Sequence, residues 1–201
     1  MSILTLPAIT PSQATWGMVS NTETFTSPLN GAVQTAGRLG DRWKTTLDFY
    51  GLSIAQGTAF DIFLASMSGA SGRVNVPPFH RNGPSLTGVT LGSGAFVSGA
   101  NQTGTTLTVT SFKSSQQVMT AGDFFTVNNE LKMLTADAFT TVTGDVALQF
   151  VPMLRTSPPN GALLNITTPT ALMRLDAQEY AITRVPGPQY QSLTLTLVEV
   201  F

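Results

Sequence analysis

The sequence predicts a mainly β fold with one packed helix, and three observations support this. Threonine and β-branched residues alternate with apolar residues over short runs, which is typical of half-buried strands. Glycine, proline and asparagine interrupt these runs at short intervals, as turns between strands do. One segment, 54–67, has its apolar residues at helical spacing instead. We therefore expect a β-sandwich-like domain with one helix, and a small β-barrel or sandwich domain inserted into it.

The first strands are expected between residues 15 and 50. The clearest covers 42–50, where Trp43, Leu47 and Phe49 alternate with charged or polar residues. Its expected partner strands are 15–20, 22–26 and 32–36, with a break at 27–31.

The helix is expected over 53–67. Ser53 and Gln56 form a capping box at its start, and Gly69 supplies a stop. Gly57 weakens the first turn by about 1 kcal/mol relative to alanine, so we expect that turn to fray. The apolar stripe that should pack on a sheet consists of Phe60, Phe63, Leu64 and Met67.

Two proline clusters, 76–84 and 156–161, divide the chain. They predict a discontinuous β domain made of residues 1–81 and 159–201, with a second β domain inserted at 82–158. Within the inserted domain, strands are expected at 105–111 and 145–151. A hairpin that turns at Asn128-Asn129 is expected within 123–135.

The C-terminal region is expected to return to strands at 171–175, 180–185 and 190–201. In the last strand the alternation slips, because Val198 and Val200 continue the face of Thr194 and Thr196. Two explanations stay open. Either a β-bulge re-registers the strand, which we favour slightly, or the face expected to meet solvent becomes an interface.

Composition excludes several classes of function. Only 10% of the residues are charged, against roughly a quarter in a typical soluble protein, and the formal net charge is −1. The basic residues are scattered, so no nucleic-acid patch is expected. Without cysteine there are no disulfides or thiolate metal sites. Neither a signal peptide nor a membrane helix is expected, so we expect folding in a cytoplasm.

Candidate catalytic groups are few, and each has a structural explanation that we favour. His80 lies in a proline-rich turn. The carboxylates Asp123, Glu130, Asp137 and Asp145 could form an acid/base pair or a metal site, but they fit solvated turns better. We therefore predict no catalytic, cofactor or metal site, and no enzyme activity.

Aromatic side chains could instead form a sugar-stacking platform, although core or interface packing is the expectation that we favour. These side chains are Trp16, Trp43, Tyr50, Tyr180 and Tyr190.

The order of these features resembles that of distal or minor tail proteins of long-tailed, siphophage-like bacteriophages. A short N-terminal arm is followed by strands containing Arg42-Trp-Lys-Thr-Thr-Leu-Asp-Phe, one helix, Gly72-Arg-Val-Asn-Val-Pro-Pro-Phe and a closing strand. The segments Ala121–Met133 and Phe150–Arg155 look like the small β modules of phage tails and baseplates. Members of that family often append an extra domain after the ring domain, whereas this chain is predicted to insert one.

The resemblance implies a structural virion protein without catalytic residues. It would form a ring, six-fold in most of the family, that joins the tail tube to the tip, baseplate or receptor-binding apparatus. The expected partners are copies of itself and other tail proteins, fibres included, with no nucleic-acid recognition and no membrane insertion. It would be assembled in the host cytoplasm and located in the virion tail.

The residues expected at its interfaces come from the N-terminal arm, the 22–39 region and the last strand: Leu4, Leu6, Thr22, Phe25, Val33, Leu39, Val198, Val200 and Phe201. The alternative is a binding module whose inserted domain attaches to a host-surface glycan or a tail fibre.

Overall fold

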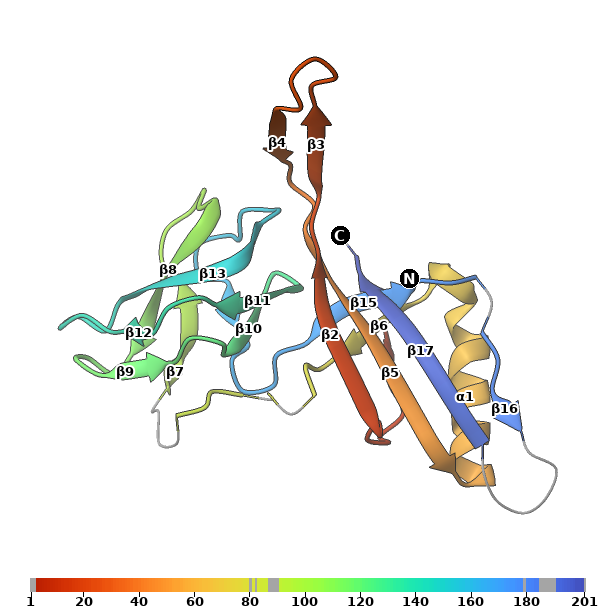
Figure 1. The fold of residues 1–201 in the computed structure, drawn as a ribbon. Coiled ribbons are helices and arrows are strands. Elements are labelled where there is room, and N and C mark those ends of the chain that lie inside the picture. Colours follow the sequence, from red (N-terminus) through yellow and green to blue (C-terminus); the bar gives the residue numbers. More distant parts are fainter. Residues whose placement is uncertain are drawn as a thin grey trace.

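The computed structural model describes residues 3–79, 81, 83–86, 91–178, 180–184 and 191–200. It confirms the predicted class. The described residues form a mainly β fold in which α1 (Ile54–Met67) is the one α-helix, followed directly by the 3₁₀ turn η1 (Gly69–Ser71) (Figure 1).

The first sheet is built from both ends of the chain, and all of its pairings are antiparallel except that between β1 and β6. Its strands are, in spatial order, β1 (Ile3–Thr5), β6 (Arg73–Val76), β15 (Ala171–Leu175), β17 (Gln191–Glu199), β5 (Arg42–Leu52) and β2 (Gln13–Val19), with β16 (Thr183–Arg184) beside β17.

A two-stranded hairpin extends from this sheet. Its strands are β3 (Thr22–Thr26) and β4 (Val33–Gly37), which pair only with each other among the described residues. We call residues 22–37 the arm. Because β2 leads into β3 and β4 leads into β5, the arm continues the line of the sheet beyond its end (Figure 1).

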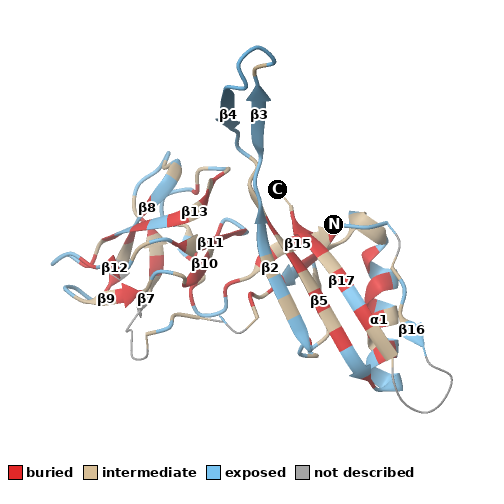
Figure 2. Cartoon of the chain, viewed as in Figure 1, coloured by how far each residue is buried: buried red, intermediate tan, exposed pale blue. Residues whose placement is uncertain are grey.

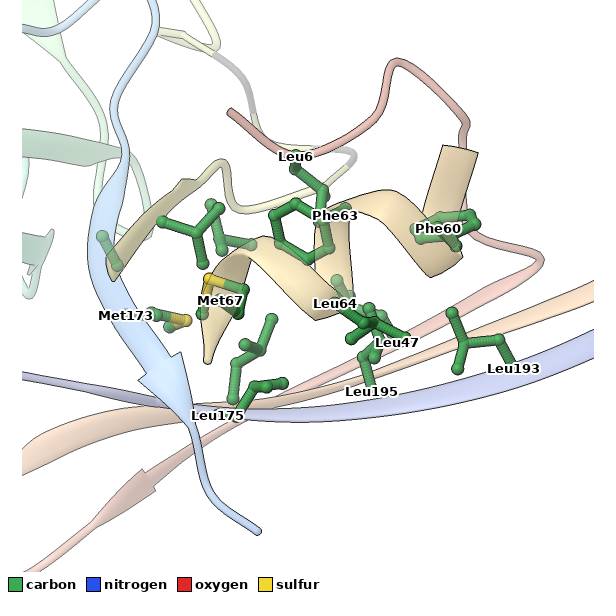
Figure 3. Close-up of a cluster of buried hydrophobic side chains, with 14 of the residues drawn as sticks. Leu6, Leu47, Phe60, Phe63, Leu64, Met67, Met173, Leu175, Leu193 and Leu195 are labelled. Carbon is green, nitrogen blue, oxygen red and sulfur yellow. The ribbon is translucent and has the colours of Figure 1, made fainter. Parts of the chain in front are cut away.

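Helix α1 covers one face of the first sheet, as its apolar stripe predicts. The predicted capping box is present, with the Ser53 side chain accepting from the Gln56 N–H and the Gln56 side chain accepting from the Ser53 N–H. Phe60 stacks on Phe49 of β5 with 4.6 Å between ring centroids. The buried side chains beneath the helix come from β5, β15 and β17 (Figure 3).

Gly57 is buried against Gln191 rather than loosening the helix. The Ser53 carbonyl accepts from the Gly57 N–H at 2.9 Å, so the first turn is closed and the expected fraying is not seen. A Cβ at position 57 would lie 1.4 Å from Gln191 Oε1. The glycine therefore makes room for a side chain of β17, a role that the helical pattern does not reveal.

A second set of strands lies between β6 and β15 in the chain. The strands of its main sheet are, in spatial order, β10 (Phe124–Val127), β11 (Glu130–Leu134), β13 (Val146–Leu154), β8 (Gly104–Phe112), β7 (Leu91–Val97) and β14 (Leu163–Leu164). The strands β9 (Gln117–Met119) and β12 (Ala138–Phe139) pair separately. We call β7–β14 the second unit, and the first sheet with α1 the first unit.

The hairpin predicted at Asn128-Asn129 is confirmed. Both asparagines have positive φ angles, 50° and 62°, as a tight turn between β10 and β11 requires. The second unit has its own buried cluster, which extends to Leu164 and Ile166. These two residues lie beyond position 158, where we expected the inserted domain to end.

The phase slip in the last strand does not come from the bulge that we favoured. The pairing of β17 with β5 runs without a register shift from Leu193 to Val198, and the irregularity lies at the other end, between Gln191 and Leu193. The bulge expected near Val198 is therefore wrong. Glu199 is in phase with Leu193, Leu195 and Leu197, and it is fully buried.

Candidate functional site

The residues expected at interfaces fall into two groups. On or beside the arm, Phe25, Val33 and Leu39 have 57 to 60% of their surface exposed, and Thr22 is also exposed. In contrast, Leu6 packs in the core of the first unit, and Val198 is 5% exposed. The fold itself therefore covers these two side chains and leaves little of them for a partner.

The remaining expected interface residues are less informative. Leu4 and Val200 are half-buried, and Phe201 lies outside the described residues. The accessible part of the predicted interface is therefore concentrated on the arm.

The arm has no cover within the described part of the chain. Every residue of β3 and β4 is exposed, and Leu29 at the tip has 96% of its surface accessible (Figure 2). From Thr24 to Gly37 there is no charged side chain. The nearest charges are Glu23 and Arg38, which form an ion pair at the root with 2.7 Å between Oε2 and Nη2.

Hydrogen bonds hold the root of the arm in line with the sheet. The Asn21 N–H donates to Asp41 Oδ1 at 2.7 Å, and the Asn21 side chain donates to the Leu39 carbonyl at 2.8 Å. The Arg38 N–H donates to the Asn21 carbonyl at 2.9 Å. These contacts join both strands across the connections at 20–21 and 38–41.

An apolar groove of about 390 Å³ lies where the first sheet meets the second unit. Its walls are aromatic and sulfur-containing side chains from β2, β5, β10 and β11, together with Pro78, Phe79 and Arg81. The residues used below are Trp16, Met18, Trp43, Phe79, Arg81 and Phe124.

The aromatic rings of the groove form a chain of edge contacts. Trp16 and Trp43 have centroids 6.4 Å apart, and Trp43 and Phe124 have centroids 5.5 Å apart. Trp43 is buried, whereas Trp16 is half-buried. The indole N–H of Trp16 is shielded from solvent and has no hydrogen-bond partner among the described residues. The walls of the groove are therefore largely apolar, and the Trp16 N–H is not among its accessible atoms.

The two units are tied together by the carboxylate of Glu199, which ends β17. Its Oε2 accepts from the Trp43 N–H at 3.1 Å and from Arg155, and its Oε1 accepts from the Leu131 N–H at 3.1 Å. In addition, Trp43 Nε1 donates to the Leu131 carbonyl at 2.9 Å. One buried acid thus contacts strands of both sheets, at a place that we call the junction.

A second buried ion pair adjoins Glu199. Lys132 Nζ donates to Glu130 Oε2 at 2.7 Å and to the Met153 carbonyl at 2.9 Å. Glu130 also accepts from the N–H groups of Arg155 and Thr156. Burial lowers the pKa of the Lys132 ammonium below its usual 10.5, against the opposing effect of Glu130.

The expectation of solvated turns is wrong for Glu130 and Asp123, which are both buried. Asp123, Asp137 and Asp145 nevertheless serve local turns. Asp123 accepts from the N–H groups of Ser85 and Thr120, and Asp137 accepts from the Ala121 N–H. Hydrogen bonds from Thr110 and Thr143 lower the pKa of Asp145. Among the described residues no group of three acids or histidines is placed to hold a metal ion. His80 lies outside the described residues.

The other aromatic residues take separate positions. The Tyr180 hydroxyl donates to the Leu64 carbonyl of α1 at 2.6 Å, and Tyr50 is exposed. Tyr190 lies outside the described residues. No shared platform forms from these tyrosines and the two tryptophans within the described structure.

Sequence reasoning missed both the groove and the junction. Leu131 and Glu199 are 68 positions apart, and Trp43 and Leu131 are 88 apart, so no local pattern links them. Two signals were present: Glu199 lies between two valines, and Lys132 lies between Leu131 and Met133. A charge at an apolar position of a strand indicates a buried partner.

In comparisons with known proteins, no protein-family model matches the chain, and no curated protein sequence is significantly similar to it. Within the described residues no helix has the length and apolar character needed to cross a membrane.

Proposed function

We propose that this chain is a structural subunit of a bacteriophage tail that assembles into a ring at the distal tail end. The ring, six-fold by the resemblance, would connect the tail tube to the tip, baseplate or receptor-binding apparatus. The observation that carries the proposal is the arm, an exposed hairpin without charge from Thr24 to Gly37 and without a packing partner among the described residues.

An uncharged surface suits repeated burial between copies. Removing an ion from water costs several kcal/mol unless it is paired, and threonine, serine and apolar groups avoid that cost.

A ring requires heterologous contacts, in which one surface of a copy meets a different surface of the next. The arm and the body of the first unit are two such surfaces. The junction supports the same proposal, because a subunit that holds its neighbours at a fixed angle needs its own two units held rigidly. Glu199 and its partners join the two units by hydrogen bonds that would restrict their relative movement.

The experiment is to measure the mass of the purified chain by sedimentation and light scattering as concentration rises, and to image the largest species by electron microscopy. We expect closed rings of one size, and we expect the protein in purified virions by mass spectrometry. A chain that stays monomeric at every concentration and is missing from virions would overturn the proposal.

A further inference from the structure

The tip of the arm carries three large apolar side chains that the described residues leave mostly exposed. Phe25 and Val33 are more than half exposed, and Leu29 is almost fully exposed. If this stretch served only as a turn, polar residues would be expected there, since exposing an apolar side chain such as leucine to water is unfavourable. The arm therefore has an apolar tip that a partner surface can bury.

The arm cannot reach the groove of its own chain. The hydrogen bonds of Asn21 hold β3 in line with β2, so the tip points away from the part of β2 that contains Trp16 and Met18 (Figure 1). Whatever occupies the groove must come from another molecule or another segment. A second copy supplies an arm that is held in the same extended position.

The groove has little charge of its own, which suits an uncharged occupant. Arg81 is its one charged lining residue, and Arg81 Nη1 already donates to the Gly122 carbonyl at 2.6 Å. A hairpin tip without charge offers apolar side chains for the largely apolar walls.

The strand that borders the groove is also open to pairing. β2 lies at the edge of the first sheet and pairs only with β5 among the described residues. Its seven residues, Gln13–Val19, include no charge and no proline, and their pairing with β5 has no bulge. Edge strands that must stay unpaired usually carry such features. This edge is suited to an incoming extended segment.

We propose that the arm tip of one copy docks into the groove between Trp16 and Phe124 of a second copy. This inference rests on the proposed self-assembly and names the contact that produces it. The contact is heterologous, with the tip as one surface and the groove as the other, so it leaves a free tip and a free groove at the ends of any open assembly.

The absence of cysteine allows a direct test. Leu29→Cys and Met18→Cys variants of the full chain, one of them carrying a tag, are mixed and oxidised. We expect a mixed disulfide dimer to accumulate. The matched control pairs Leu29→Cys with Val142→Cys, since Val142 is 83% exposed and does not line the groove. Self-association measured by sedimentation, with no mixed dimer above the control, would overturn the docking site and leave the proposed function standing.

A second measurement uses the two tryptophans, which both line the groove and are the only ones in the chain. Their fluorescence should change as the wild type associates. Leu29→Asp should weaken association by about tenfold or more and remove that change at the same concentrations. The control, Ile62→Asp on the exposed side of α1, should retain both. If Leu29→Asp associates like the wild type, or if the wild type never associates, the inference is wrong. The proposed function fails with it only if the protein is also missing from virions.

Discussion

At the junction Glu130, Lys132 and Glu199 are buried and paired, whereas the arm places no charge between Glu23 and Arg38. The chain thus buries and pairs charged side chains at the junction and has none over most of the arm. It has only ten basic and eleven acidic residues, and some of them lie inside. The surface is therefore poorer in charge than the composition alone indicates.

The difference shows what each region has to do. Buried ions stabilise little on balance, but an ion pair with its hydrogen bonds satisfied permits few arrangements, so it can fix the angle between two units. We infer this role for Glu199, which contacts β5, β11 and Arg155 together. The arm has the opposite property. It can be buried by a partner without removing an ion from water.

The largest effect is expected from Glu199→Ala. It leaves Arg155 without this carboxylate and two backbone N–H groups without an acceptor, so the free energy of unfolding should fall by about 3–5 kcal/mol. Urea denaturation measures this. The control is Asp176→Ala, which breaks the exposed pair with Lys44 and should cost at most about 1 kcal/mol. Equal losses in the two variants would mean that the buried contacts of Glu199 stabilise the fold no more than an exposed ion pair does.

A somewhat smaller loss, about 3 kcal/mol, is expected from Lys132→Met, because Glu130 stays buried without its ion pair but keeps two backbone donors. The pH dependence is a sharper test. The pKa of Lys132 is lowered in the folded state, so between that pKa and 10.5 the unfolded chain binds more protons and the wild type gains stability as pH rises. Urea titrations at several alkaline pH values should show this gain in the wild type and its loss in Lys132→Met.

Trp43→Phe tests the hydrogen bond between the units with little change of shape. The ring contacts with Phe124 can persist, but the Leu131 carbonyl loses the indole donor. We expect a loss of about 1–2 kcal/mol by urea denaturation. Trp16→Phe is the comparison, since its N–H has no partner among the described residues and its removal should cost less. If Trp16→Phe cost more stability than Trp43→Phe, our assignment of the hydrogen bond to the Trp43 indole would be wrong.

The smallest effect on folding is expected from Leu29→Ser at the arm tip. Leu29 buries almost nothing in the isolated chain, so its unfolding free energy, measured at a concentration where the chain is monomeric, should change by less than about 0.5 kcal/mol. Assembly measured on the same sample should weaken. A large loss of monomer stability would show that the arm is part of the fold, and the contrast between arm and junction would then fail.

The secondary structure was largely predictable, because its signals are local. The stripe from Phe60 to Met67 and the Ser53–Gln56 capping box predicted α1, and Asn128-Asn129 predicted the β10–β11 turn. Expected strands that fell short lay in segments with weak alternation. An example is 180–185, whose described residues, 180–184, contain only β16. The arm was predictable as a pair of strands but not as an exposed hairpin, because the sequence does not state which strands lack a neighbour.

Local pattern was thus sufficient for the mainly β class, the helix and most strand positions, since periodicity, capping and turn preferences act over a few residues. Three-dimensional packing alone decided that Glu199 faces inward, that Gly57 accommodates Gln191, and that Trp16 and Phe124 share a groove. Each of these depends on a contact between segments far apart in the chain. Burial and pairing are properties of such contacts, and no short stretch of sequence contains both partners.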